Sequence, residues 1–353
     1  MMTAKMKPGG YYDRTYEQTL RILYTPWQWV ALIIFMLFLI IFPTFASSHL
    51  LTIGIRLGIT IITVVGLNIV VGSTGLLNVG QAAFMAVGAY CSSMLMSKVG
   101  INFFPALLAA GIAGALVGLL FGAPSLRIKG FYVALATLAG YFIIIWALIE
   151  WFGGITGHPA PRPEIFGFTF ESDISFYYLV GAITLFLSLF ARNLFRSRVG
   201  RAFVSLRDHD IAAEILGINV FRYKMLSFGV GCFYAGIAGA LQAHFWGYTN
   251  IEAFPFSDSI WFLGMVIVGG LGSVLGSVFG AVLFVALDEV VVVVPSLVLA
   301  LFPSFADFGQ MEAGLKWLVF SIVIIVFVIF EPNGMVHRWN LIKSSFRVYP
   351  FNY

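Results

Sequence analysis

Charged side chains are scarce in this sequence. Asp, Glu, Lys and Arg make up 10% of its 353 residues, and hydrophobic residues make up 60%. Soluble domains average about 25% charged and roughly 45–50% apolar residues. So little charge cannot cover a surface exposed to water, which excludes a soluble globular protein. We expect an all-α polytopic integral membrane protein in contact with membrane lipid and with no nucleic acid partner.

Cysteines and catalytic motifs are also scarce. Cys91 and Cys232 lie in apolar runs without metal-ligand spacing, which excludes a disulfide framework and a zinc site. The sequence has no phosphate-binding loop, no GxSxG elbow and no HExxH helix. Its five histidines are scattered, and His244 is expected at a membrane edge. We therefore predict no enzyme activity and no cofactor on this chain; any ATP and Mg would be bound by a separate ATPase.

Long apolar runs fill most of the chain. A spanning helix needs about 20 apolar residues, and the sequence predicts ten spans, at 28–46, 50–71, 79–97, 101–122, 130–151, 175–191, 225–246, 259–281, 283–301 and 315–331. With a cytoplasmic N-terminus, only Lys98, Arg162 and Lys316 fall on the outer side, as the positive-inside rule requires. The prediction is a multi-pass domain over 28–331 in a bacterial inner membrane. Residues 1–27, which lack the apolar core of a signal peptide, and 332–353 form cytoplasmic tails.

One polar island, residues 197–217, interrupts the apolar runs inside a basic loop over 192–224. Ile211, Ile215 and Ile218 fall on one face of a predicted short helix outside the bilayer. Such a helix can contact a soluble partner. The alternative is a helix lying on anionic lipid, which the acidic side chains disfavour. These are Asp208, Asp210 and Glu214.

Glycines cluster in two places, at 66–80 and 264–280. The first cluster flanks a connection without charge, which predicts irregular backbone at membrane depth, next to a path for a small polar solute. The predicted pathway residues are Asn68, Ser73, Thr74, Asn78, Gln81 and Phe84. The alternative reading of both clusters is close packing of helices through small residues.

The two clusters fall at matching places if the ten spans form two inverted sets of five, an arrangement typical of transporters. Acidic residues inside spans can indicate ion coupling. However, Glu150 and Asp258 are expected at outer ends, and Asp288 and Glu289 near the cytoplasmic end. An ion-coupled carrier or channel is therefore the less favoured alternative.

Five ordered motifs give the chain a family resemblance. GSTGLLNVGQAAFMAVGAY (72–90) resembles a G-x-x-G-x-x-S-x-G-H-A-A-F-x-x-x-G-A-Y run, with Asn78 and Gln81 replacing the common Ser and His. The others are LRIKGFYVALATLA (126–139), the island with its continuation to 241, MVIVGGLGSVLGSVFGA (265–281) and FEPNGM (330–335), where Glu331 replaces the usual Arg. The chain resembles permease subunits of branched-chain amino acid ABC importers.

The resemblance implies that the island carries a coupling helix, which docks in a groove on the ATPase. Asp208 and Asp210 would then begin this helix, Ala212 and Ala213 would permit close docking, and Gly217 would end it. The implied partners are ABC ATPase subunits, a second and different permease subunit, and a periplasmic binding protein. The Pro-rich outer loop 153–175 is interpreted as the docking surface for that protein, although its composition equally suits a passive linker. Related permeases carry urea, short amides or aromatic acids, so the resemblance leaves the solute open.

Overall fold

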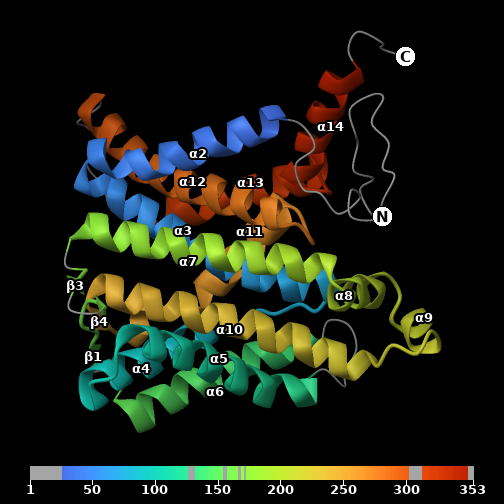
Figure 1. Cartoon of the computed structure of the whole chain (residues 1–353), viewed down its shortest axis with the longest axis horizontal. Coiled ribbons are helices and arrows are strands. Elements are labelled where there is room, and N and C mark those ends of the chain that lie inside the picture. The colour runs from blue at the N-terminus through green and yellow to red at the C-terminus, as the bar shows by residue number, and fades with distance from the viewer. Residues whose placement is uncertain are drawn as a thin grey trace.

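The structure is a computed structural model that describes residues 26–125, 132–153, 157–165, 168–170, 172–301 and 312–348. Long helices lie side by side along one direction (Figure 1). Those before the island are α2 (Pro26–Phe45), α3 (Ser48–Thr74), α4 (Gln81–Met94) with its π-helical extension (Leu95–Val99), α5 (Phe103–Ser125), α6 (Tyr132–Phe152) and α7 (Asp173–Arg196). Those from the island onward are α8 (Arg198–Asp208), α9 (Asp210–Ile215), α10 (Val220–Trp246), α11 (Phe256–Gly269), α12 (Val274–Leu301), α13 (Glu312–Phe330) and α14 (Met335–Val348).

The two ends of the bundle differ. Helices α8 and α9 lie at one end, the right of Figure 1, which we call the island end. Short strands lie at the opposite, strand end, where β1 (His158–Pro159) pairs with β4 (Tyr248–Thr249), and β2 (Glu164–Ile165) pairs with β3 (Phe168–Thr169). Each β pair joins only two residues per strand, so the fold is helical throughout its described core.

Eight described helices are long and apolar enough to span a membrane, or nine if the pair Trp317–Phe330 and Met335–Ser344, bent by 47°, counts as one. These helices confirm the predicted all-α polytopic architecture, and the count of ten spans stays a prediction. The predicted boundaries at 259–301 are wrong, because α11 ends at Gly269 and α12 runs unbroken from Val274 to Leu301. The cytoplasmic placement of the termini and the inverted halves stay predictions.

Helix α10 lies at the centre of the bundle. It packs against α3, α4 and α5, and 67% of its apolar span is buried, more than for the other spans. A Cβ added at Gly88 of α4 would overlap the carbonyl oxygen of Gly236, and one at Gly239 would overlap that of Met85. The backbones of α4 and α10 are thus in direct contact, as is usual where small residues line membrane helix interfaces.

The chain leaves helical geometry at two places inside this bundle. The first break, residues 75–80, begins at Gly75, whose φ of 72° ends α3 in the left-handed region. It returns into the bundle, because the Gln81 side chain at the start of α4 donates to the carbonyl of Thr63, about three turns before the end of α3. The predicted irregular backbone between Gly72 and Gly80 is confirmed for residues 75–80.

The second break, residues 270–273, separates α11 from α12. Gly270 and Gly272 have φ angles of 126° and 75°, which side-chain-bearing residues rarely adopt. The sequence remains apolar on both sides of these residues, so the glycines are its one indication of a break here. Helices α4 and α11 also contact each other, because the amide of Ala82 in α4 donates to Ser259 Oγ of α11 at 2.9 Å.

Candidate functional site

Asn68 of α3 holds the second break. Its Nδ2 donates to the carbonyl of Ser273 at 2.9 Å and to Ser277 Oγ at 2.8 Å, and its Oδ1 accepts from the amide of Gly272 at 2.8 Å. The side chain is fully buried. Since its amide group is occupied by these bonds, Asn68 fixes backbone in this conformation and does not present a free group to a solute.

The turn after α13 packs on the same break. Gly334 has a φ of 75°, and a Cβ added there would lie 2.6 Å from the Cα of Gly270. Glu331, at the position where the family usually has Arg, accepts a hydrogen bond from Arg338 Nε. The departure from the family motif is therefore matched by a partner in the following helix, α14.

Arg207, the next-to-last residue of α8, reaches this region from the island. Its Nη1 donates to the carbonyl of Gly72 at 2.7 Å, and a Cβ added at Gly272 would lie 3.1 Å from the same nitrogen. We call the meeting point of these segments the glycine junction. It consists of Asn68, Gly72, Arg207, residues 270–273 and Gly334.

Asn78 and Gln81 shape the first break. Asn78 Nδ2 donates to Gln81 Oε1 at 2.8 Å, and Asn78 Oδ1 accepts from the amide of Gly80 at 3.0 Å. Thr137 of α6 accepts from the amide of Val79 at 3.1 Å. The polar side chains thus satisfy one another and the irregular backbone, as buried polar groups must.

The other predicted pathway residues are enclosed as well. Ser73 donates to the carbonyl of Ile69, and Thr74 donates to that of Val70 at 2.7 Å. Phe84 packs edge-on against Phe228. All six are buried: Asn68, Ser73, Thr74, Asn78, Gln81 and Phe84. This conformation brings them around the two breaks without exposing them to water, and their contact with a solute stays a prediction.

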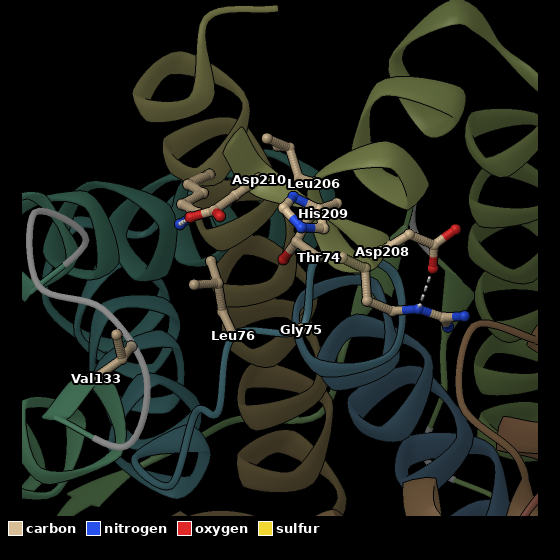
Figure 2. Close-up of a pocket in the computed structure, with 10 residues that line it drawn as sticks. Thr74, Gly75, Leu76, Val133, Leu206, Asp208, His209 and Asp210 are labelled. Atoms are coloured by element: carbon tan, nitrogen blue, oxygen red, sulfur yellow. Dashed lines mark ion pairs between the residues drawn. The ribbon is translucent and has the colours of Figure 1, made fainter. Parts of the chain in front are cut away.

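A cavity of about 290 Å³ opens at the island end (Figure 2). Asp210 and the buried Lys224 form an ion pair of 3.7 Å at its wall. Thr74 is the only predicted pathway residue in the lining of this cavity. The lining residues are Thr74, Gly75, Leu76, Val133, Leu206, Arg207, Asp208, His209, Asp210 and Lys224.

The island forms two helices where one was predicted. They are separated at His209, whose Nδ1 accepts from the amide of Ala212 at 3.5 Å and so caps α9. The prediction that the aspartates provide this cap is wrong. Asp208 ends α8 and pairs with Arg207 Nε at 3.6 Å, whereas Asp210 lies in the first turn of α9, where its charge favours the helix dipole.

Helix α9 presents an apolar tip to its surroundings. Ile211, Ile215 and Leu216 are 52%, 81% and 79% exposed, while Ala212 and Glu214 are exposed beside them. Ala213 is buried by its own chain, so the prediction that it permits close docking of a partner is wrong.

The end of α9 follows the predicted pattern. Gly217, with a φ of 84°, closes the helix, and the amide of Ile218 donates back to the carbonyl of Ala213. Ile218 lies beyond the end of α9, so it is not part of the isoleucine face that was predicted for this helix. The sequence analysis did not predict that Leu216 belongs to the apolar tip or that Arg207 belongs to the glycine junction. Leu216 directly follows Ile215, and Arg207 is one of the island's basic residues.

Two further expectations need correction. His244 does lie at the strand end of the bundle, in the last turn of α10, but it is fully buried instead of interfacial, and it bridges Ser92 Oγ at 2.7 Å to the carbonyl of Pro161 at 2.8 Å. Asp288 and Glu289 lie in the middle of α12 and not near the island end, because α12 begins at Val274. They pair with Arg56 at 3.0 Å and His49 at 3.1 Å, in the first third of α3.

Comparisons with known proteins assign this arrangement to a family. The chain matches the family described as branched-chain amino acid transport system / permease component over residues 49–329. It is 36% identical over 275 residues to the high-affinity branched-chain amino acid transport system permease protein LivM of Salmonella typhimurium. The aligned residues cover 70% of this chain and 64% of that relative.

Other relatives give the same picture. The LivM protein of Escherichia coli is 34% identical over 290 residues, covering 74% of this chain and 68% of that protein. The LivH protein of the same organism is 27% identical over 252 residues, covering 65% and 81%. The chain thus spans about two thirds of the length of the LivM relatives. We found no significant match among solved structures. The chain belongs to the family of permease components of branched-chain amino acid transport systems.

Proposed function

We propose that this chain is the permease subunit of an ATP-driven ABC importer for branched-chain or related amino acids in a bacterial inner membrane. It forms half of the translocation pathway and is not itself an enzyme. The observation that carries the proposal is the exposed apolar tip of α9, Ile211, Ile215 and Leu216, next to the cavity at the island end. Family membership supports the class of transport system.

The α9 tip has the properties of a coupling helix. Burying an exposed isoleucine or leucine side chain contributes about 1.5–3 kcal/mol, so a partner with an apolar groove would gain from covering Ile215 and Leu216. Asp208 and Asp210 are held by Arg207 and Lys224 within the chain. The tip itself is therefore apolar, while Glu214 remains exposed beside it for a polar contact.

The arrangement supports three kinds of partner. A separate ATPase chain, which binds ATP and Mg, would dock on the α9 tip on the cytoplasmic side, and a second ATPase chain would dock on the other permease subunit. A periplasmic binding protein would dock at the strand end, where β1 and β4 join the loop after α6 to the end of α10. A second, different permease subunit would complete the pathway.

An ATPase-binding measurement tests the proposal. Ile215→Asp places a carboxylate in the apolar tip and should weaken binding of the ATPase by about tenfold or more, since a buried unpaired charge costs several kcal/mol. Ile215→Leu keeps an apolar side chain of the same size and serves as the matched control. Equal binding by both variants would show that the α9 tip does not dock the ATPase.

The solute is tested by competition. In vesicles with the full complex, uptake of labelled leucine should be reduced by unlabelled isoleucine or valine and not by urea, acetamide or phenylalanine. The alternative permease functions, for urea, short amides or aromatic acids, predict the reverse order. An ion-coupled carrier has less support, because the described acids Asp288 and Glu289 are paired with Arg56 and His49.

A further inference from the structure

We infer that Arg207 is the positioning residue that joins the island to both backbone breaks, so that movement of α8 and α9 is passed directly to the glycine junction. The inference rests on the proposed function, because it assigns the residue that carries motion from the docked ATPase into the membrane helices. It goes beyond the α9 tip, since Arg207 lies on α8 and points into the protein.

The first step is the contact with α3. The last carbonyls of a helix have no amide partner within the helix, and a cation is favoured there. Gly72 is in the last turn of α3, and its carbonyl accepts from Arg207 Nη1 at 2.7 Å. A Cβ added at Gly75 would lie 3.3 Å from Arg207 Cγ. The arginine therefore lies against the end of α3, where the first break begins.

The second step leads from α3 to the second break. Asn68 is one helical turn before Gly72 and so shares its face. Its side chain accepts from the amide of Gly272 and donates to the carbonyl of Ser273. A Cβ added at Gly72 would overlap both Asn68 Oδ1 and the Gly272 nitrogen. The Asn68 side chain joins the two closely spaced backbones, so we expect a shift of Gly72 to move Gly272 as well.

The third step concerns the need for arginine. The guanidinium donates to Gly72 from one end while its Nε faces Asp208 Oδ1 at 3.6 Å, the ion pair drawn in Figure 2. A planar group with several donors in fixed directions can hold both partners, which the single ammonium of lysine cannot do. The Arg207 side chain is 34% exposed, so it lies at the boundary between the island and the packed bundle.

The experiment uses the complete importer in lipid vesicles. Arg207→Ala should lower ATP-driven uptake about tenfold, the change expected from losing one charge-assisted hydrogen bond in the moving contact, while the ATPase stays bound. Arg207→Lys should recover part of the uptake. Arg201→Ala is the matched control, because Arg201 is exposed on the same helix and its guanidinium donates to the carbonyl of Arg196 at 3.4 Å.

Two outcomes would overturn the inference. Uptake by Arg207→Ala within twofold of wild type would show that the contact carries no motion. Loss of ATPase binding together with uptake would make Arg207 part of the docking surface instead. A merely structural role predicts neither the retained binding nor the partial recovery with lysine.

A second readout separates this inference from the proposed function. Amide hydrogen exchange in residues 68–80 and 268–280 should differ between the ATP-bound and nucleotide-free complex, and Arg207→Ala should abolish the difference in both segments. If the wild-type complex shows no ATP-driven uptake, the proposed function fails. In that case, amide hydrogen exchange in the purified chain tests the role of Arg207. Arg207→Ala should raise exchange in both segments. If exchange changes in neither segment, Arg207 does not link the island to the glycine junction.

Discussion

At the scale of single residues, some glycines allow two helix backbones to approach more closely than any side chain would permit. Gly88 lies where α4 touches the backbone of α10, and an added Cβ would overlap the backbone of Gly236. Gly181 of α7 has no atom within 4 Å of the corresponding position. The sequence alone cannot separate these two residues, since each is a glycine within an apolar helix.

This difference gives the first prediction. Gly88→Ala should destabilise the fold by about 1–3 kcal/mol, because overpacked interfaces can relax only by moving backbone. Gly181→Ala should leave stability unchanged or raise it, since alanine favours a helix. Thermal unfolding in detergent measures both. Equal stability of the two variants would contradict the direct backbone contact.

Asn68 gives the second prediction. Asn68→Asp replaces the donating nitrogen by an oxygen that faces the Ser273 carbonyl and Ser277 Oγ. It should lower stability by about 1–3 kcal/mol or more, since a buried charged group without its hydrogen bonds is costly. Asn102→Asp, at the exposed start of α5, is the control. Unchanged melting of Asn68→Asp would favour a role toward solute over the structural role.

At the scale of elements, the loop before α7 depends on one buried histidine. The Pro161 carbonyl can only accept, so Nδ1 of His244 donates to it and Nε2 accepts from the hydroxyl of Ser92. His244→Ala leaves both partners without this bond and should increase hydrogen exchange in residues 157–165. His337→Ala, on exposed α14, should not. Unchanged exchange in both variants would mean that the β1–β4 pairing holds the loop without the histidine.

The two breaks show what sequence reasoning can and cannot predict. The first was predictable because glycines flank a connection without charge. The second lies inside the predicted span 259–281, because hydropathy does not register a break whose polar groups are satisfied by Asn68, far earlier in the chain. The island was predictable from its charge. Its division at His209 was not, because Asp208 and Asp210 are better caps by composition than histidine.

Four of the five motifs that carry the family resemblance lie close together in the structure. The segments 72–90, 197–241, 265–281 and 330–335 all contribute to the glycine junction or its immediate surroundings. In the remaining motif, 126–139, residues 126–131 lie outside the described residues. Sequence order separates these motifs by long spans, so only the fold brings them together.

At the scale of the whole molecule, the island bears on how many subunits the proposed importer needs. An importer with two ATPase chains needs two docking elements, and α9 is the one exposed tip within the charged loop between α7 and α10. Under the proposed function, a second permease would supply the other element. The purified chain alone in vesicles should therefore show no solute uptake with or without ATP. Robust uptake by the isolated chain would instead favour a carrier or channel.

The central position of α10 has a consequence for how the protein is made. Helices α3, α4 and α5 pack on α10, and the glycine backbone of α4 closes against it. The ribosome completes these three helices before it reaches residue 220. Their inner surfaces therefore stay uncovered throughout synthesis of residues 126–246, and the unfinished bundle must wait in the bilayer, or with an insertion factor, until its centre arrives.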